Sequence, residues 1–122
     1  MAQGEDDLEA AGILRNAGKH AQACFMAQQA AEEALKAALY SYLRRSRTHM
    51  LGELVEDLDK NAPEIVHDYA RVLDGYYIPT RYANGHDSGA PFTHYGALQS
   101  KQAIEYASVL IEFSRSRMAE SR

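Results

Sequence analysis

An alanine-rich stretch with helical periodicity dominates the first third of the chain. Residues 21–39 read AQACFMAQQAAEEALKAAL, with alanine at eight of the 19 positions. Alanine favours the helix and permits close approach of a partner helix. Apolar residues also recur along one face at steps of three or four. That face is marked by Cys24, Ala27, Ala31, Leu35, Ala38 and Tyr42. The pattern predicts a long helix from Ala21 to about Leu43 with another helix packed closely against it.

Four more stretches show helical spacing of apolar residues, and none shows the alternation of a strand. The expected helices are residues 5–17, a third after a Thr48 cap through Leu58, a fourth from Asn61 and Pro63 to between Gly75 and Pro79, and a last one at about 97–118. Each amphipathic stripe must be covered by another helix. We therefore expect an all-α fold, an antiparallel bundle of about five helices.

Composition narrows the class of protein. With 122 residues and 46% apolar content, the chain fits one domain, with its core at about residues 5–118. A formal charge of -4 argues against a general basic surface that coats DNA, so any contact with nucleic acid is expected to be local. The start is acidic, and nowhere do 18 apolar residues follow one another. The sequence predicts a cytoplasmic protein without a membrane segment.

Neither metal nor cofactor is expected. The single cysteine, Cys24, lies in the alanine-rich stretch and is interpreted as a buried, inert thiol. The five histidines show no spacing typical of metal ligands. The NGHDSG segment lacks the Lys-Ser or Lys-Thr of a phosphate-binding loop.

Residues 76–89, YYIPTRYANGHDSG, gather aromatic and charged side chains after the fourth helix. Pro79, Gly85 and Gly89 break helical periodicity, so the segment is predicted to be a loop, and loops of this content often carry function. Tyr76 continues the apolar stripe and is expected in the core. Tyr77 and Tyr82 are the candidates for stacking on a base.

A second candidate is the densest positive run of the chain. It comprises Arg44, Arg45, Arg47 and His49, just after the alanine-rich helix. Cations at a helix C-terminus offset the helix dipole, which is one explanation. The other is a phosphate-binding rim that includes Arg47 and His49.

Three blocks, FMAQQAAEEALKAAL, THMLGELVEDL and LDGYYIPTRYANGH, together resemble the HEPN domain (higher eukaryotes and prokaryotes nucleotide-binding), in particular prokaryotic members with a YIPTRY segment. The resemblance covers most of residues 8–118. It implies an antiparallel helical bundle, commonly a homodimer, in a family of nucleotide-binding modules and metal-independent ribonucleases. Many bacterial and archaeal members look like the toxin half of a pair with a minimal nucleotidyltransferase.

The ribonuclease pattern of that family is an arginine, a short spacer and a histidine, which Arg81 and His86 match. In such a site the arginine would grip phosphate oxygens and the histidine would act as base or acid. Two positions depart from the family: Ser88 stands where toxins carry a tyrosine, and Ala83 where a proline is usual. Alternatively, Arg81 pairs with a carboxylate to pin the loop and His86 is a solvated polar residue.

Three functions are compatible with these residues. The sequence favours a homodimer that binds a nucleotide or RNA segment near the loop without fast turnover. The second function is a metal-independent endoribonuclease toxin that uses Arg81 and His86. The third is a docking partner for a nucleotidyltransferase. We expect the first and last helices to form the dimer face.

Overall fold

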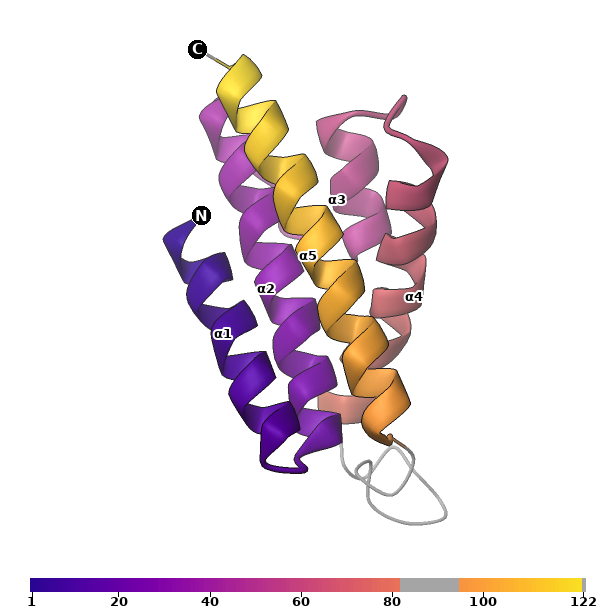
Figure 1. The fold of residues 1–122 in the computed structure, drawn as a ribbon. Coiled ribbons are helices and arrows are strands. Elements are labelled where there is room, and N and C mark those ends of the chain that lie inside the picture. Colours follow the sequence, from indigo (N-terminus) through magenta and orange to yellow (C-terminus); the bar gives the residue numbers. More distant parts are fainter. Residues whose placement is uncertain (82–94, 122) are drawn as a thin grey trace.

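The structure is a computed structural model that describes residues 1–81 and 95–121, with side chains described through Tyr77 and again from Tyr95. Within these ranges the secondary structure is five α-helices without a strand: α1 (Ala2–Asn16), α2 (His20–Ser41), α3 (Leu51–Leu58), α4 (Glu64–Arg81) and α5 (Ala97–Glu120). α1 and α4 run opposite to α2 and α5 (Figure 1). The predicted all-α bundle is confirmed.

The alanine-rich helix α2 is the centre of the bundle, in contact with each of the other helices. Its inner alanines are fully buried, among them Ala23, Ala27, Ala30, Ala31, Ala34 and Ala38. Small side chains here let α1 and α5 approach the α2 backbone. At Gly4 of α1, an added Cβ would lie 2.9 Å from the Ala30 carbonyl oxygen. This close approach requires glycine, because that contact is with backbone, which cannot swing away.

α1 begins at Ala2, so the predicted start at residue 5 is wrong. The Glu5 N–H donates to the Met1 carbonyl at 3.1 Å, which closes the first turn. Met1 and Leu8 pack against a cluster formed by Ala30 and Ala34 of α2 and Ile111 of α5. Tertiary packing therefore holds a turn that the acidic, polar sequence alone would leave frayed.

α4 continues to Arg81, so the predicted helix break between Gly75 and Pro79 is wrong. Pro79 lacks an N–H and forfeits the bond to the Gly75 carbonyl, but near the end of a helix this is a single lost bond. Tyr76 packs against the core and meets the Tyr95 ring edge-on, with ring centroids 5.6 Å apart. Tyr76 is partly buried and Tyr77 is buried. Packing of these two aromatic side chains against the core offsets the lost bond.

Thr48 is not the N-cap of α3, which begins at Leu51 with Met50 as N-cap. The Thr48 hydroxyl accepts the Met50 N–H at 3.1 Å and donates to Glu53. The first N–H groups of α3 are instead bound by Asp74 of α4. A carboxylate from a neighbouring helix has replaced the local cap.

The chain reverses direction at the end of α2. Leu43 has a φ of 60°, and the Arg44 N–H donates to the Leu39 carbonyl at 3.0 Å. This closure is typical of helix C-termini, where the left-handed residue is usually glycine. The segment 42–50 then returns alongside α2, where Gln28 Nε2 donates to the His49 carbonyl at 3.2 Å.

Cys24 is fully buried, as predicted. Burial raises the pKa of its thiol from 9.0 to about 12. The thiolate is therefore not populated at neutral pH, which agrees with an inert cysteine. None of the described helices is long and apolar enough to cross a membrane.

The α1–α2 contact leads to a test with two glycines of the same helix. Gly4→Ala should lower the free energy of unfolding by about 1–2 kcal/mol, because the new methyl group meets the Ala30 carbonyl. Gly12→Ala is the matched control, since a Cβ there meets nothing within 4 Å, and it should stabilise by about 0.5–1 kcal/mol through helix propensity. Urea unfolding measures both; equal stabilisation by the two variants would contradict the close approach.

Candidate functional site

A buried carboxylate on α2 organises the candidate site. The Glu32 side chain is 5% exposed, and its Oε2 accepts from His49 Nδ1 at 2.8 Å and from Lys36 Nζ at 2.9 Å. Gln28, one turn earlier, donates from Nε2 to Glu32 Oε1 at 3.4 Å and to the His49 carbonyl at 3.2 Å. Buried polar groups need partners, and here Lys36 of α2 and the returning segment 42–50 supply them.

His49 connects this cluster to α4. Its ring stacks on the Tyr77 ring, with centroids 5.6 Å apart and an interplanar angle of 11°. The His49 side chain is 52% exposed, whereas Tyr77 is buried. Two predicted binding residues, 28 positions apart in sequence, therefore share one face. Arg81 is the last residue of α4, one helical turn beyond Tyr77.

Arg47 lies two residues before His49 and is exposed. In the part of the chain that the structure describes, Arg44, Arg45 and Arg47 form no ion pair. Arg45 lies over the Tyr40 ring, 5.4 Å from its centroid. Because α2 ends at Ser41, these arginines follow the last helical turn, which weakens the dipole explanation. Contact with phosphate stays a prediction.

Other predicted site residues fall where the structure gives no account of them. Tyr82 and His86 lie outside the described residues, and of Arg81 only the backbone is described. The pairing of Arg81 with His86 therefore stays a prediction. Among the described residues, no three His, Cys, Asp or Glu side chains gather as metal ligands, and the absence of a metal also stays a prediction.

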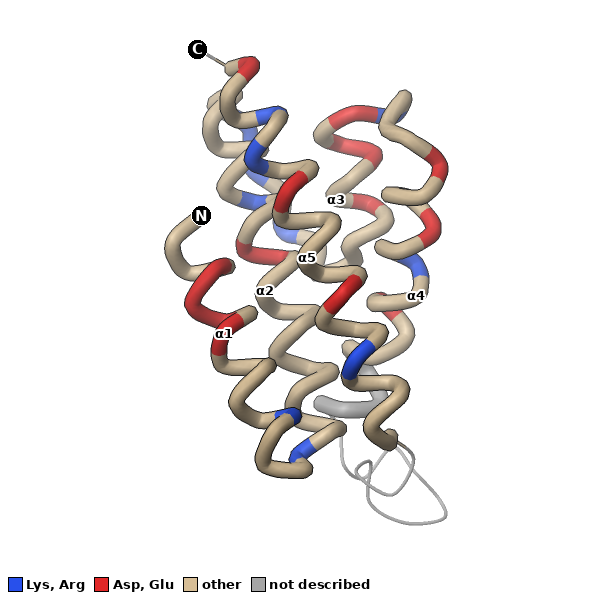
Figure 2. Tube along the Cα trace, in the orientation of Figure 1, with Lys and Arg blue, Asp and Glu red and all other residues tan. Residues whose placement is uncertain are grey.

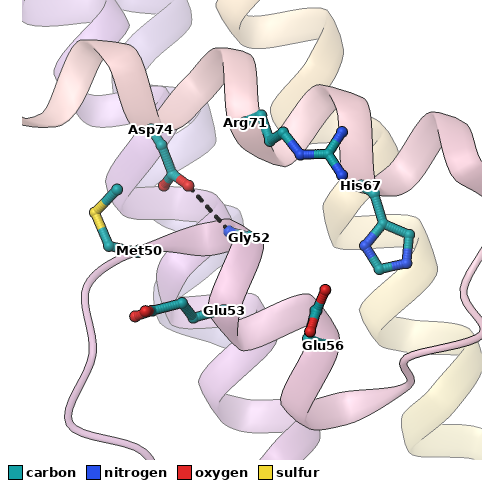
Figure 3. Close-up of a pocket in the computed structure, with 7 residues that line it drawn as sticks. All are labelled: Met50, Gly52, Glu53, Glu56, His67, Arg71 and Asp74. Carbon is teal, nitrogen blue, oxygen red and sulfur yellow. Dashed lines mark hydrogen bonds between the residues drawn. The ribbon is translucent and has the colours of Figure 1, made fainter.

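A groove of about 350 Å³ lies between α3 and α4 (Figure 3). Its lining residues are Met50, Gly52, Glu53, Glu56, His67, Arg71 and Asp74. Asp74 Oδ1 accepts the Leu51 N–H at 2.6 Å, and Oδ2 accepts the Gly52 N–H at 3.0 Å. Burial raises the pKa of Asp74, the Glu53 and Glu32 carboxylates raise it further, and the two backbone N–H groups oppose them.

The charge of this groove argues against phosphate as its ligand. Among the described residues that line it are three carboxylates and Arg71, which pairs with Asp68 at 2.8 Å. Acidic residues mark α3 and α4, whereas lysine and arginine gather toward the C-terminal ends of α2 and α5 (Figure 2). An anionic ligand is therefore repelled from the groove. The His49–Tyr77 face is the better candidate for such a ligand.

Sequence reasoning missed four residues that build these sites: Gln28, Glu32, Lys36 and Asp74. The sequence held a signal for the three residues on α2. Gln28 and Glu32 stand four residues apart within the apolar side of an alanine-rich helix, where polar residues need a specific partner. Lys36 follows Glu32 at the i+4 spacing of a helical ion pair. Asp74 gave no such signal, because its partners are backbone groups of another helix.

The raised pKa of Asp74 predicts a pH dependence. The folded state holds this proton more tightly than the unfolded chain, so the stability from this group is complete below its ordinary pKa of 3.8 and is lost as the pH rises through the folded pKa. Asp74→Asn cannot ionise and should become more stable relative to wild type as the pH rises from 3 toward neutrality. Denaturant unfolding at several pH values measures this, with Asp68→Asn, an exposed carboxylate on the same helix, as control. A drift of the same size in the control would contradict the assignment.

A family model and several solved structures are similar to this chain. The HEPN domain model matches residues 1–117. The crystal structure of TT1696 from Thermus thermophilus superposes with a TM-score of 0.90 at 36% identity, covering 95% of this chain and 93% of that one. ST0689, an archaeal HEPN homologue, superposes with a TM-score of 0.83 at 30% identity, covering 96% of this chain and 93% of that one. A HEPN domain protein from Thermotoga maritima superposes with a TM-score of 0.73 at 28% identity, covering 93% of this chain and 91% of that one.

A comparison with curated proteins found no match. The family rests on the domain model, which spans nearly the whole chain, and on ST0689, an archaeal HEPN homologue at 30% identity. Since sequence model and fold agree, the chain belongs to the HEPN domain family.

Proposed function

We propose that this protein binds a nucleotide or a segment of RNA on the face formed by His49, Tyr77 and the end of α4 at Arg81. The observation that carries the proposal is the stack of His49 on Tyr77 beside a helix that ends in arginine. The exposed His49 ring offers a surface for a base, and the guanidinium of Arg81 offers two N–H groups to a phosphate. Membership of the HEPN family supports a role with nucleotides.

The neighbouring residues extend the same face. Arg47, exposed and without an acidic partner among the described residues, would add a phosphate contact beside His49. Tyr82 and His86 follow Arg81 in sequence and belong to the proposed site as a stacking residue and a polar contact. The protein would act in the cytoplasm.

We also propose that the protein is a homodimer. Large apolar side chains stay exposed on the predicted dimer helices: Ile13 of α1 is 63% exposed, and Leu98 and Val109 of α5 are 73% and 37% exposed. α4 adds Ile65 and Val72, at 50% and 41%. A second copy would cover such side chains.

The second candidate function is a metal-independent endoribonuclease that uses Arg81 and His86. Continuation of α4 to Arg81 favours it, because a helix fixes the backbone of the arginine that would hold the phosphate. In this version a minimal nucleotidyltransferase would be the antitoxin partner. A nucleotidyltransferase gene next to this one would support that pairing.

Binding can be tested at Arg81. Arg81→Ala should weaken RNA binding about tenfold, roughly 1.4 kcal/mol, and lower the slope of log affinity against log salt by about 0.7, the effect of one lost phosphate contact on a single strand. Calorimetric titration of a short RNA at several salt concentrations measures both. Arg71→Ala, on the same helix but at the acidic groove, is the control and should leave affinity unchanged. Unchanged affinity with lowered thermal stability in Arg81→Ala would instead favour an arginine that pins the loop.

The oligomeric state can be tested with α5. Light scattering at micromolar concentration should give twice the 13.6 kDa mass of the chain. Leu98→Glu should shift the mass to that of a monomer, because a charge would be buried in the proposed interface. A monomer mass for the wild-type protein would refute the dimer.

A further inference from the structure

The hydrogen bond between Glu32 and His49 fixes the chemistry of the imidazole. A carboxylate only accepts hydrogen bonds, so the Nδ1 atom that lies 2.8 Å from Glu32 Oε2 carries the hydrogen. In the neutral ring the lone pair then belongs to Nε2. Nε2 is thereby the acceptor of the ring, on a side chain that is 52% exposed.

Several contacts hold this pair in place. Lys36 and Gln28 bind the Glu32 carboxylate, and Gln28 also binds the His49 carbonyl. The Tyr77 ring supports one face of the imidazole. A base whose second nitrogen is oriented by a carboxylate is the arrangement that enzymes use for proton transfer. His20 provides a contrast: its Nδ1 lies 2.9 Å from the hydroxyl of Ser100, a fully buried residue, which joins α2 to α5 without a carboxylate.

We propose that His49 is the general base of the RNA site and that Glu32 is its positioning residue. This inference rests on the proposed function, because it places the reaction where RNA is proposed to bind. Glu32, at 5% exposure, acts through the imidazole. Neither residue belongs to the Arg81–His86 pattern.

The reaction is attack of a ribose 2′-hydroxyl on the adjacent phosphate. His49 Nε2 takes the hydroxyl proton, the O2′–P bond forms and the P–O5′ bond breaks. The departing 5′-oxygen takes a proton from water, and His49 returns its own proton to the solvent. The products are a 2′,3′-cyclic phosphate and a 5′-hydroxyl end, so no oxidant, reductant or metal enters the balance.

The test uses the full chain, a short RNA and the same sequence with 2′-fluoro in place of each 2′-hydroxyl, all with chelator present. Wild type should cleave the RNA, and His49→Ala should lower kcat at least about 100-fold, the typical contribution of general base catalysis. It should bind the 2′-fluoro analogue within about threefold of wild type, since a base contributes little to ground-state binding. Added imidazole should restore part of the lost rate. His67→Ala, a histidine of the α3–α4 groove, is the control and should cleave normally.

Glu32→Gln tests the positioning role. Glutamine can still accept the Nδ1–H but carries no charge, so kcat should fall about tenfold or more at unchanged KM. A residue that only stabilised the fold would change the unfolding midpoint without this split. The fall in kcat at unchanged KM also keeps the proposal testable if His49→Ala does not fold.

Three outcomes overturn the inference. If the wild type cleaves none of several RNAs, the inference is wrong. The proposed binding function is then still supported if the 2′-fluoro analogue binds. If that analogue does not bind either, the proposed function fails as well. Cleavage that survives His49→Ala but disappears in His86→Ala would assign the base to His86.

Discussion

The whole structure depends on the burial of α2 against every other helix. Alanine lines its inner side, and Gly4 of α1 approaches its backbone so closely that a Cβ would lie 2.9 Å from a carbonyl oxygen. Two polar residues, Gln28 and Glu32, are buried with these alanines. Buried polar groups without partners cost free energy, so their satisfaction constrains the neighbouring chain. The segment 42–50 meets this constraint when it returns along α2 and presents His49 to Glu32.

Much of the fold could be predicted from the sequence, because helical periodicity is a local signal. The helices, their order and the close approach of a partner to the alanine-rich helix follow from spacing and composition, whereas its contact with every other helix is known only from the structure. The errors arose where distant contacts decide local structure. α4 passes Pro79 where Tyr77 is buried and Tyr76, partly buried, packs against the core. α3 starts at Leu51 because Asp74, 23 residues later, binds its first N–H.

The candidate site was predictable only in part, because its residues are brought together by contacts between distant segments. Tyr77 and His49 were identified as binding residues from their types and from the family resemblance, each in its own segment. Their stacking depends on the path of segment 42–50 and on the length of α4. The role of Glu32 could not be read from spacing alone, because its partner His49 lies 17 residues away and approaches from outside the helix. A glutamate within an apolar face is nevertheless a signal that such a partner exists.

Charge separates two neighbouring faces of the molecule. The N-terminus of α3 would ordinarily attract anions, but Asp74 already binds its N–H groups, and Glu53 and Glu56 line the groove beside it. A phosphate approaching from that side meets three carboxylates. On the other face the Glu32 carboxylate is buried and bound by Lys36 and the imidazole, whereas the ring of His49 is exposed. Glu32 belongs to the core and also orients this ring, so a substitution there changes packing and chemistry together. The kcat and KM of Glu32→Gln, measured beside its unfolding midpoint, separate these two effects.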